Sequence, residues 1–475
     1  MNERITFGTD GWRDIIADGF TFHNVRLVSR AIANHILHEG RGEQGVVVAH
    51  DNRFMASDFA RQVAGVLAAA GIPVMLSRTT TPTPAAAFAV QKHGAAGAVM
   101  LTASHNPPRY MGIKFIPHYA GPAMPAETDD LVARIRDVAE QGEVPFRHVE
   151  DAGNLVEMMD IKDAYLEHMA AVVDRNILAS SSLKIVVDPM HGAGAGYMEE
   201  FLKDVCEVTA IRNYADPLFG GALPDPTRQH LDLLVETVAR KGSHLGVALD
   251  GDADRLGVVD GAGRYYSPNQ ILTMFLHYLT GDKGYKKGRV ARTVATTHML
   301  DRIAAREGLE VLETPVGFKY ICDMMVKKDI LIGGEETGGI GFKGYIPERD
   351  GFLSALLIME LMASRKRALS EILSDLDRKY GKFVYEREDI LFDASKRKKL
   401  LSGLGKEPLK KVLGKEVVKV NDSDGYKFML RDGTWLLLRL SGTEPKLRIY
   451  SETPSRKRSL EYIAFGKRYA FGLMK

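Results

Sequence analysis

Cysteine is scarce in this chain, and long apolar runs are missing. Cys206 and Cys322 are the two cysteines, and they lie far apart in no metal-binding spacing, which argues against a disulfide scaffold and suits a reducing cytoplasm. The longest apolar stretch, residues 352–363, includes Glu360 and is shorter than the roughly 20 residues that span a bilayer. The charged N-terminal residues are followed by no apolar segment, so no signal peptide is expected. We therefore expect a cytoplasmic protein with no membrane partner.

An excess of charge of either sign is also missing. The 63 Lys and Arg residues against 61 Asp and Glu residues give a net charge of +2, so the overall charge predicts no nucleic-acid partner. One segment, residues 396–419, is rich in lysine, but apolar residues within it predict an amphipathic helix with a solvated lysine face: Leu400, Leu401, Leu409 and Val412. Steering of anionic substrates by these lysines stays open, and a nucleic-acid arm is the less favoured interpretation.

Apolar segments of strand length alternate with helical patterns along most of the chain. The predicted strands include residues 45–50, 72–76, 95–101 and 183–187, and the predicted helices include 57–70, 161–173, 269–279 and 298–307. This alternation is typical of α/β domains. With 45% apolar and 26% charged residues the composition is globular. At roughly 150 residues per domain the length predicts about three domains.

Four polar loops follow apolar runs, and the first contains a candidate nucleophile. It reads Thr-Ala-Ser-His-Asn-Pro at 102–107 and follows the predicted strand 95–101, with Lys114 shortly after. We expect this strand to deliver Ser104 to the edge of a sheet in an exposed turn, because Pro107 and Pro108 restrict the backbone there. A hydroxyl beside a cation suits a nucleophile, although an isolated serine of this kind is more often a turn or cap residue.

The second loop carries three carboxylates. Asp250, Asp252 and Asp254 follow the apolar residues 245–249, and their spacing places them on one face of an extended backbone. Three crowded anions repel one another unless a cation lies among them, and oxygen ligands suit a hard ion such as Mg²⁺. A calcium EF-hand is excluded, because its sixth and twelfth positions would be Arg255 and Gly261. A solvated acidic turn is the alternative.

The third and fourth loops have groups that suit a sugar and a phosphate. Residues 333–342 read GGEETGGIGF, in which two glutamates and a threonine lie between glycines that allow close approach of the backbone. Residues 439–450 read RLSGTEPKLRIY, in which hydroxyls, backbone N–H groups and two arginines can bind an anion. Taken singly, the third loop can be an ordinary turn and the fourth a β-turn with two surface arginines.

Together the four loops resemble those of the α-D-phosphohexomutase superfamily, which includes phosphoglucomutases, phosphomannomutases and phosphoglucosamine mutases. TASHNP, DGDADR, GEETGG and RLSGTEP occur in the family's order, and the N-terminal FGTDGWR at residues 7–13 is also similar. The resemblance spans essentially the whole chain. It implies an α/β fold of four domains around a central cleft, with three mixed α/β sheet domains and a smaller α+β C-terminal domain. The expected boundaries are 1–153, 154–258, 259–372 and 373–475.

The resemblance also implies a role for each matching residue. Ser104 would carry a phosphoryl group and, with Asp250, Asp252 and Asp254, would hold one Mg²⁺ per chain. The expected catalytic residues are Ser104, Lys114, His105, Arg13 and Arg255, with Lys114 the better candidate of its neighbours for proton transfer or charge neutralisation. The expected substrate-binding residues are Lys319, Glu335 and Thr337 for the sugar and Arg439, Ser441, Gly442, Thr443 and Arg448 for the phosphate that is not being transferred.

Two positions depart from the family pattern. Met111 stands where an asparagine is usual before Gly112-Ile113-Lys114, so any role of that asparagine is missing. Gly339 stands where some bifunctional relatives have a histidine proposed as an acid or base. The third loop therefore looks nearer to the glucose type, and the proton-transfer group is less defined.

The expected enzyme is an isomerase, an intramolecular phosphotransferase that converts glucose 1-phosphate and glucose 6-phosphate through glucose 1,6-bisphosphate. Mannose phosphates stay open as substrates, because Glu335 and Thr337 do not discriminate the C2 epimer. A phosphoglucosamine mutase is the alternative, disfavoured because its sugar loops usually differ at the residue matching Glu336. A non-catalytic sugar-phosphate-binding protein is disfavoured because Ser104 and the three aspartates are intact. The expected partner is a hexose phosphate, and the chain is expected to be a monomer or homodimer.

Overall fold

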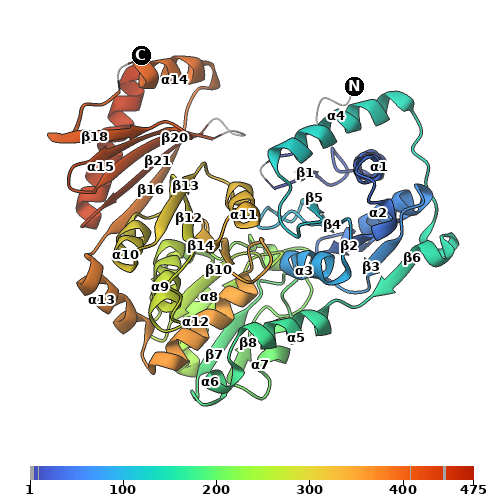
Figure 1. Ribbon diagram of the computed structural model, residues 1–475, viewed down its shortest axis with the longest axis horizontal. Coiled ribbons are helices and arrows are strands. Elements are labelled where there is room, and N and C mark those ends of the chain that lie inside the picture. The colour runs from blue at the N-terminus through green and yellow to red at the C-terminus, as the bar shows by residue number, and fades with distance from the viewer. Residues whose placement is uncertain (1–4, 9, 407, 442–445, 475) are drawn as a thin grey trace.

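Four β-sheets succeed one another along the chain. The structure is a computed structural model that describes residues 5–8, 10–406, 408–441 and 446–474. The units built on the first and fourth sheets lie at opposite ends of the molecule, blue and red in Figure 1, with the second and third between them. Every helix among these described residues is too short or too polar to traverse a bilayer. The architecture is the predicted one, three mixed α/β units followed by a C-terminal antiparallel sheet.

The first sheet has the strand order β1-β5-β4-β2-β3-β6. Its strands are β1 (Trp12–Ile15), β2 (Val46–His50), β3 (Val74–Ser77), β4 (Gly97–Leu101), β5 (Tyr110–Pro117) and β6 (Val156–Met159). The accompanying helices are α1 (Phe22–His38), α2 (Ala56–Ala69), α3 (Thr83–His93) and α4 (Pro125–Gln141). Strands β2 and β4 are buried along their whole length, as expected for strands covered by helices on both faces.

The second and third sheets have the orders β11-β10-β9-β7-β8 and β13-β12-β14-β15. The second contains β7 (Lys184–Asp188), β8 (Glu207–Ala210), β9 (Leu245–Leu249), β10 (Leu256–Asp260) and β11 (Tyr265–Tyr266). The third contains β12 (Arg289–Thr293), β13 (Glu310–Thr314), β14 (Ile330–Gly334) and β15 (Ile340–Phe342). Their helices are α5 (Lys162–Val172), α6 (Arg175–Ala179), α7 (Tyr197–Leu202), α8 (Asp232–Lys241), α9 (Pro268–Gly281), α10 (Met299–Glu307), α11 (Phe318–Lys327), α12 (Gly351–Arg365) and α13 (Leu369–Tyr380).

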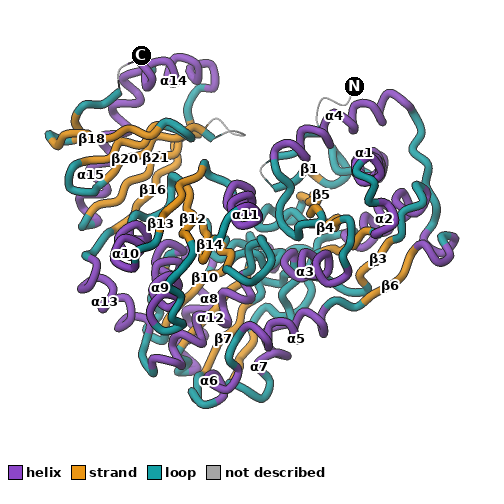
Figure 2. The backbone as a smooth tube through the Cα atoms, in the orientation of Figure 1, coloured by secondary structure: helices purple, strands orange, loops and turns teal. Residues whose placement is uncertain are grey.

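The fourth sheet is antiparallel throughout, in the order β16-β21-β20-β19-β18-β17. Its strands are β16 (Val384–Leu391), β17 (Lys411–Val412), β18 (Lys415–Asn421), β19 (Tyr426–Leu430), β20 (Trp435–Leu440) and β21 (Lys446–Thr453). Helices α14 (Arg397–Lys406) and α15 (Arg456–Leu473) pack against it through one apolar cluster. Figure 2 shows these two helices beside the strands of this sheet, which forms a separate layer at the C-terminal end.

The elements predicted by range lie within two residues of the expected positions, with one exception. The lysine-rich segment 396–419 is not one helix. It is helical only over α14, and after Pro408 it forms β17 and β18. Glycines at 403 and 405 weaken the helix, and a proline cannot donate the hydrogen bond that would continue it. Leu400 and Val412 are buried as predicted, whereas Leu401 is exposed.

The first three sheets place their functional loops at equivalent positions. Strands β4, β9 and β14 each have a parallel neighbour on one side and an antiparallel neighbour on the other. The loop with Ser104 follows β4, the loop with the three aspartates follows β9, and the loop with Glu335 follows β14. Ligands of open α/β sheets bind beyond the carboxyl ends of strands. This shared topology therefore places all three loops where a ligand is expected to bind.

Candidate active site

Ser104 lies in a turn after β4, and this residue is buried, whereas the sequence predicted an exposed turn. The residue is 1% exposed, because the loop after β9 packs directly on it. A side chain on Gly251 would come within 2.4 Å of the Ser104 carbonyl oxygen, so only glycine allows this contact. The backbone of Ser104 has a φ of 51°, which is uncommon for a residue other than glycine.

Arg53 holds this turn in place, a role that the sequence did not reveal. Its guanidinium is buried and donates to four backbone carbonyls of the loop at 2.6 to 3.0 Å: Ser104, Asn106, Pro107 and Tyr110. Asp51 pairs with Arg53 at 3.1 Å and accepts a hydrogen bond of 2.7 Å from Thr102, whose hydroxyl in turn accepts from the Ser104 backbone N–H. The unusual backbone of Ser104 is therefore fixed by side chains on two neighbouring strand ends.

The three aspartates meet Ser104. The Ser104 hydroxyl donates to Asp250 Oδ2 at 2.8 Å, and one oxygen from each of Asp250, Asp252 and Asp254 lies within 4.8 Å of the others. A turn with a left-handed residue at Ala253 brings the carboxylates together, not the extended backbone that the spacing suggested. The N-terminus of α3 supports the loop, since Thr83 donates its hydroxyl to Asp252 at 2.6 Å and its backbone N–H to the Asp252 carbonyl.

The donor set of this cluster fits a hard metal ion. All three aspartates are at most 1% exposed, and Oδ1 of Asp252 and Oδ1 of Asp254 have no hydrogen-bond partner among the residues that the structure describes. Burial, together with the charges of Asp254 and Asp252, holds the pKa of Asp250 well above its usual value. Two buried carboxylate oxygens of the cluster are therefore available to a cation.

Lys114 lies among the carboxylates as their main counter-charge. Its Nζ is 2.7 Å from Asp252 Oδ2, 3.0 Å from Asp254 Oδ2 and 3.0 Å from Asp10 Oδ2. Burial acts to lower the pKa of Lys114, but Asp10, Asp252 and Asp254 outweigh it and raise that pKa above its usual value. In this arrangement Lys114 is a fixed ammonium ion.

His105, Arg13 and Arg255 lie around the same hydroxyl. His105 Nδ1 is 3.3 Å from Ser104 Oγ, and the charge of Arg255, with burial and Arg13, holds the pKa of His105 well below its usual value, so the ring is neutral. Arg13 donates to Asn106 Oδ1 at 2.8 Å and to Asp10 at 3.1 Å. The backbone N–H of Arg255 donates to Asp250 Oδ1 at 3.0 Å. The five residues predicted as catalytic thus occupy one site.

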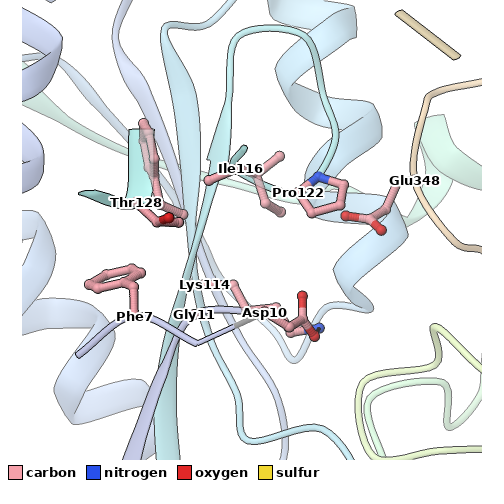
Figure 3. Close-up of a pocket in the computed structure, with 10 residues that line it drawn as sticks. Phe7, Asp10, Gly11, Lys114, Ile116, Pro122, Thr128 and Glu348 are labelled. Carbon is pink, nitrogen blue, oxygen red and sulfur yellow. Dashed lines mark ion pairs between the residues drawn. The ribbon is translucent and has the colours of Figure 1, made fainter. Parts of the chain in front are cut away.

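Three further charged residues belong to this site and were not predicted. Asp10 and Arg349 pair with each other at 3.0 Å, and Arg349 also donates to Asp254 at 2.6 Å. Glu348 lines the same small pocket as Asp10 and Lys114, and Figure 3 shows it reaching in from a separate loop, with Lys114 next to Asp10. Burial raises the pKa of Glu348 to about 8, against the opposing charges of Arg349 and Lys114.

Of the predicted sugar-binding residues, Glu335 is joined to this cluster. It is buried, accepts from the Gly317 backbone N–H at 2.9 Å and lies 4.0 Å from Arg349 Nη1. Thr337 is partly exposed in the same loop. Lys319, on α11, is half-buried, and burial lowers its pKa.

The fourth loop supplies two arginines from one face of the fourth sheet. Arg439 and Arg448 are paired residues of β20 and β21. Arg439 donates to Asp424 at 2.7 Å, and Arg448 lies 3.6 Å from Asp389. Ser441 is buried, and its carbonyl accepts from Arg397 at 2.8 Å. Gly442 and Thr443, predicted for the same purpose, lie outside the described residues.

A buried hydroxyl among carboxylates and cations, reached from three α/β sheets, is the arrangement of a phosphoryl-transfer enzyme. Comparison with known proteins agrees. Residues 4–142, 163–263 and 267–380 match the phosphoglucomutase/phosphomannomutase alpha/beta/alpha domains I, II and III, and residues 398–464 match the C-terminal domain of the same family.

Individual relatives match along their whole length. The phosphoglucomutase/phosphomannomutase of Thermococcus kodakarensis is 30% identical over 97% of both chains. The phosphoglucosamine mutase of Carboxydothermus hydrogenoformans is 30% identical over 96% of this chain and 97% of its own. A solved structure from Thermus thermophilus, named as a phosphomannomutase, is 35% identical with a TM-score of 0.85, covering 99% of this chain and all of the other.

The chain therefore belongs to the phosphoglucomutase/phosphomannomutase family of the α-D-phosphohexomutase superfamily. It is a phosphohexomutase, an isomerase that acts as an intramolecular phosphotransferase.

Proposed function

We propose that this phosphohexomutase is a phosphoglucomutase that interconverts glucose 1-phosphate and glucose 6-phosphate through a phosphorylated Ser104 and a glucose 1,6-bisphosphate intermediate. The observation that carries the proposal is the buried Ser104 hydroxyl, hydrogen bonded to Asp250 within the three-aspartate cluster. Asp250, Asp252, Asp254 and the phosphorylated Ser104 hold one Mg²⁺, which when bound supplies a Lewis acid for phosphoryl transfer. Mannose phosphates are included as substrates.

The first half of the reaction transfers the phosphoryl group to the sugar. The P–O bond to Ser104 breaks, a P–O bond to the free hydroxyl of the hexose phosphate forms, and the proton of that hydroxyl is transferred, through a base, to the released Ser104 oxygen. The neutral ring of His105, 3.3 Å from Ser104 Oγ, is placed to exchange a proton with that oxygen. Lys114, Arg13 and Arg255 offset the charge that develops on the transferred group.

The second half reverses these steps with the other phosphate. The bisphosphate turns over so that its second phosphate faces Ser104, which takes that phosphate and leaves the isomeric monophosphate. Glu335, Thr337 and Lys319 bind the sugar, and the fourth loop holds the phosphate that is not being transferred, through Arg439, Ser441, Gly442, Thr443 and Arg448. Ser104 is 1% exposed, and such burial limits the access of water, which would otherwise hydrolyse the phosphoserine.

A phosphoglucosamine mutase is the competing assignment, favoured by the relative of that name with equal sequence identity. The third loop supports the glucose type. Glu336 accepts a hydrogen bond of 3.2 Å from Thr293 of β12, so this carboxylate has a defined position beside Glu335.

The deciding experiment measures conversion of glucose 1-phosphate with Mg²⁺ and catalytic glucose 1,6-bisphosphate, against mannose 1-phosphate and glucosamine 1-phosphate as competitors. Fast turnover of glucose 1-phosphate that Ser104→Ala abolishes supports the proposal. A preference for glucosamine 1-phosphate would reassign the substrate, and release of free phosphate at the rate of turnover would indicate a phosphatase.

A further inference from the structure

The fourth sheet has two different faces. Side chains alternate along a strand, and in β20 Leu436 and Leu438 pack under α14 and α15, whereas Trp435, Leu437 and Arg439 project to the opposite side. On that opposite side Trp435, Leu437 and Tyr450 pack against Val294 and Ala295, which follow β12 of the third sheet. The arginine that is proposed to bind phosphate therefore belongs to the face by which the fourth unit contacts the third.

Two buried polar links fasten this contact. Glu452 of β21 accepts from the His298 backbone N–H at 2.9 Å and from Trp435 Nε1 at 3.0 Å, and it also accepts from Thr297. Lys427 of β19 is fully buried and donates to Glu313 of β13 at 3.0 Å. Glu452 and Lys427 are buried between the two sheets, and Glu313, the partner of Lys427, is 20% exposed.

A third polar link between the two units includes a candidate phosphate-binding residue. Asp424 Oδ2 accepts two hydrogen bonds, one of 2.7 Å from Arg439 Nε and one of 2.8 Å from the Val316 backbone N–H. The side chain of Asp424 is 21% exposed and that of Arg439 is 12% exposed. One carboxylate oxygen thus orients a candidate phosphate-binding arginine and holds a loop of the third unit.

That loop continues directly to the catalytic cluster. Gly317, next to Val316, donates its backbone N–H to Glu335 at 2.9 Å. Glu335 lies 4.0 Å from Arg349, and Arg349 donates to Asp254 at 2.6 Å. Polar contacts, together with the peptide bond between Val316 and Gly317, therefore connect Arg439, through Asp424, to the aspartate cluster around Ser104.

We propose that Asp424 is a positioning residue for substrate binding: it sets the orientation of Arg439 and couples the grip on the distal phosphate to the loop that supports Glu335. The inference rests on the proposed function and adds to it the residue through which two parts of the site act together. The contact between the two units does not depend on this pair alone, because Glu452 and Lys427 also join them.

The test compares Asp424→Asn with Asp422→Asn, an exposed aspartate two residues earlier in the same loop. Binding of glucose 6-phosphate is measured by titration calorimetry, and KM and kcat for glucose 1-phosphate are measured separately. We expect Asp424→Asn to weaken binding and raise KM about tenfold while kcat changes less. The reason is that a poorly oriented Arg439 weakens the binding of the phosphate more than it slows phosphoryl transfer. Asp422→Asn and the melting temperatures of both variants should match the wild type. Affinity in Asp424→Asn equal to that of the wild type overturns the inference.

A double variant tests whether Asp424 acts through Arg439. In an Arg439→Gln background, Asp424→Asn should weaken glucose 6-phosphate binding less than twofold further, because the group that it orients is gone. Two independent, multiplying effects would overturn the inference. Binding without turnover in the wild type would refute the proposed function and leave this test of Asp424 intact, because calorimetry does not depend on catalysis.

Discussion

Around Ser104, side chains are buried and tied to several partners, whereas the arginines of the fourth sheet are more accessible. Lys114 and Arg349 are 5% and 7% exposed and each contacts at least two carboxylates, while the side chain of Arg448 is 23% exposed. Phosphoryl transfer requires fixed geometry, so the catalytic end is assembled before substrate arrives. Under the proposed function the other end accepts a phosphate on either C1 or C6, and partly exposed guanidiniums on a sheet face can adjust to both.

The largest effect is expected from removing the nucleophile at the rigid end. Ser104→Ala should lower mutase activity by at least about 10³-fold, because no other group can carry the phosphoryl group between the two half-reactions. A coupled assay for glucose 6-phosphate measures the loss. Retention of more than a few per cent of wild-type activity would mean that another residue is phosphorylated.

The rigidity of that end is tested by Arg53→Met. This change leaves Asp51 buried without its partner and removes four hydrogen bonds to the loop, so the free energy of unfolding should fall by about 4 kcal/mol, as for a broken buried ion pair. Urea unfolding measures it. Arg61→Met is the control, because its partner Glu150 is exposed and the expected loss is below about 1 kcal/mol. Equal losses in the two variants would show that Arg53 does not hold the loop.

Glu335 lies between the catalytic cluster and the arginines of the fourth sheet. Its ionisation is expected to lower the free energy of unfolding. Burial, with the charge of Glu336, raises the pKa of Glu335 to about 7 in the folded protein from 4.5. The folded state then binds more protons than the unfolded state between these values, so stability falls as pH rises from about 4.5 to 7, by about 3 kcal/mol.

Glu335→Gln should remove this loss. The variant should gain stability relative to the wild type as pH rises through that window, measured by urea unfolding at pH 5 and pH 8. Glu310→Gln, at an exposed position of the same sheet, is the control and should show no such gain. A difference between variant and wild type that is the same at both pH values would contradict the prediction.

The smallest effect is expected at the adjustable end. Arg448→Lys replaces a planar fork by a point charge and should raise KM for glucose 1-phosphate about fivefold to tenfold with little change in kcat. Arg431→Lys, on an exposed turn of the same sheet, should change neither. If kcat fell as much as KM rose, Arg448 would act in the chemical step and the two ends would not be separable.

The loops and their order could be predicted because each depends on a local pattern. An apolar strand followed by a hydroxyl, by three aspartates or by glycine-flanked glutamates is visible in a few residues, and the structure places Ser104, Lys114 and Asp250 in one cluster. The equivalent positions of β4, β9 and β14 in their sheets could not be predicted from the sequence, because they depend on which strands pair.

The residues that support the site could not be predicted, because their roles depend on contacts between distant segments. Arg53 in Asp-Asn-Arg looks like part of a surface turn, and it becomes essential only because residues 104–110 fold over it. Arg349 lies 339 residues from its partner Asp10. The burial of Ser104 has the same origin, since Gly251, which covers it, belongs to the loop after β9 of the second sheet.

The two different faces of the fourth sheet have a consequence for a chain in which β20 pairs in the wrong register. Arg439 projects to one face while its neighbours Leu438 and Leu440 pack into the core on the other. A slip of one residue in β20 would exchange the faces and place the guanidinium in the core under α14 and α15. A misregistered chain would therefore bury an unpaired charge, so the error that takes Arg439 from its place beside Asp424 would also lower the stability of the fourth unit.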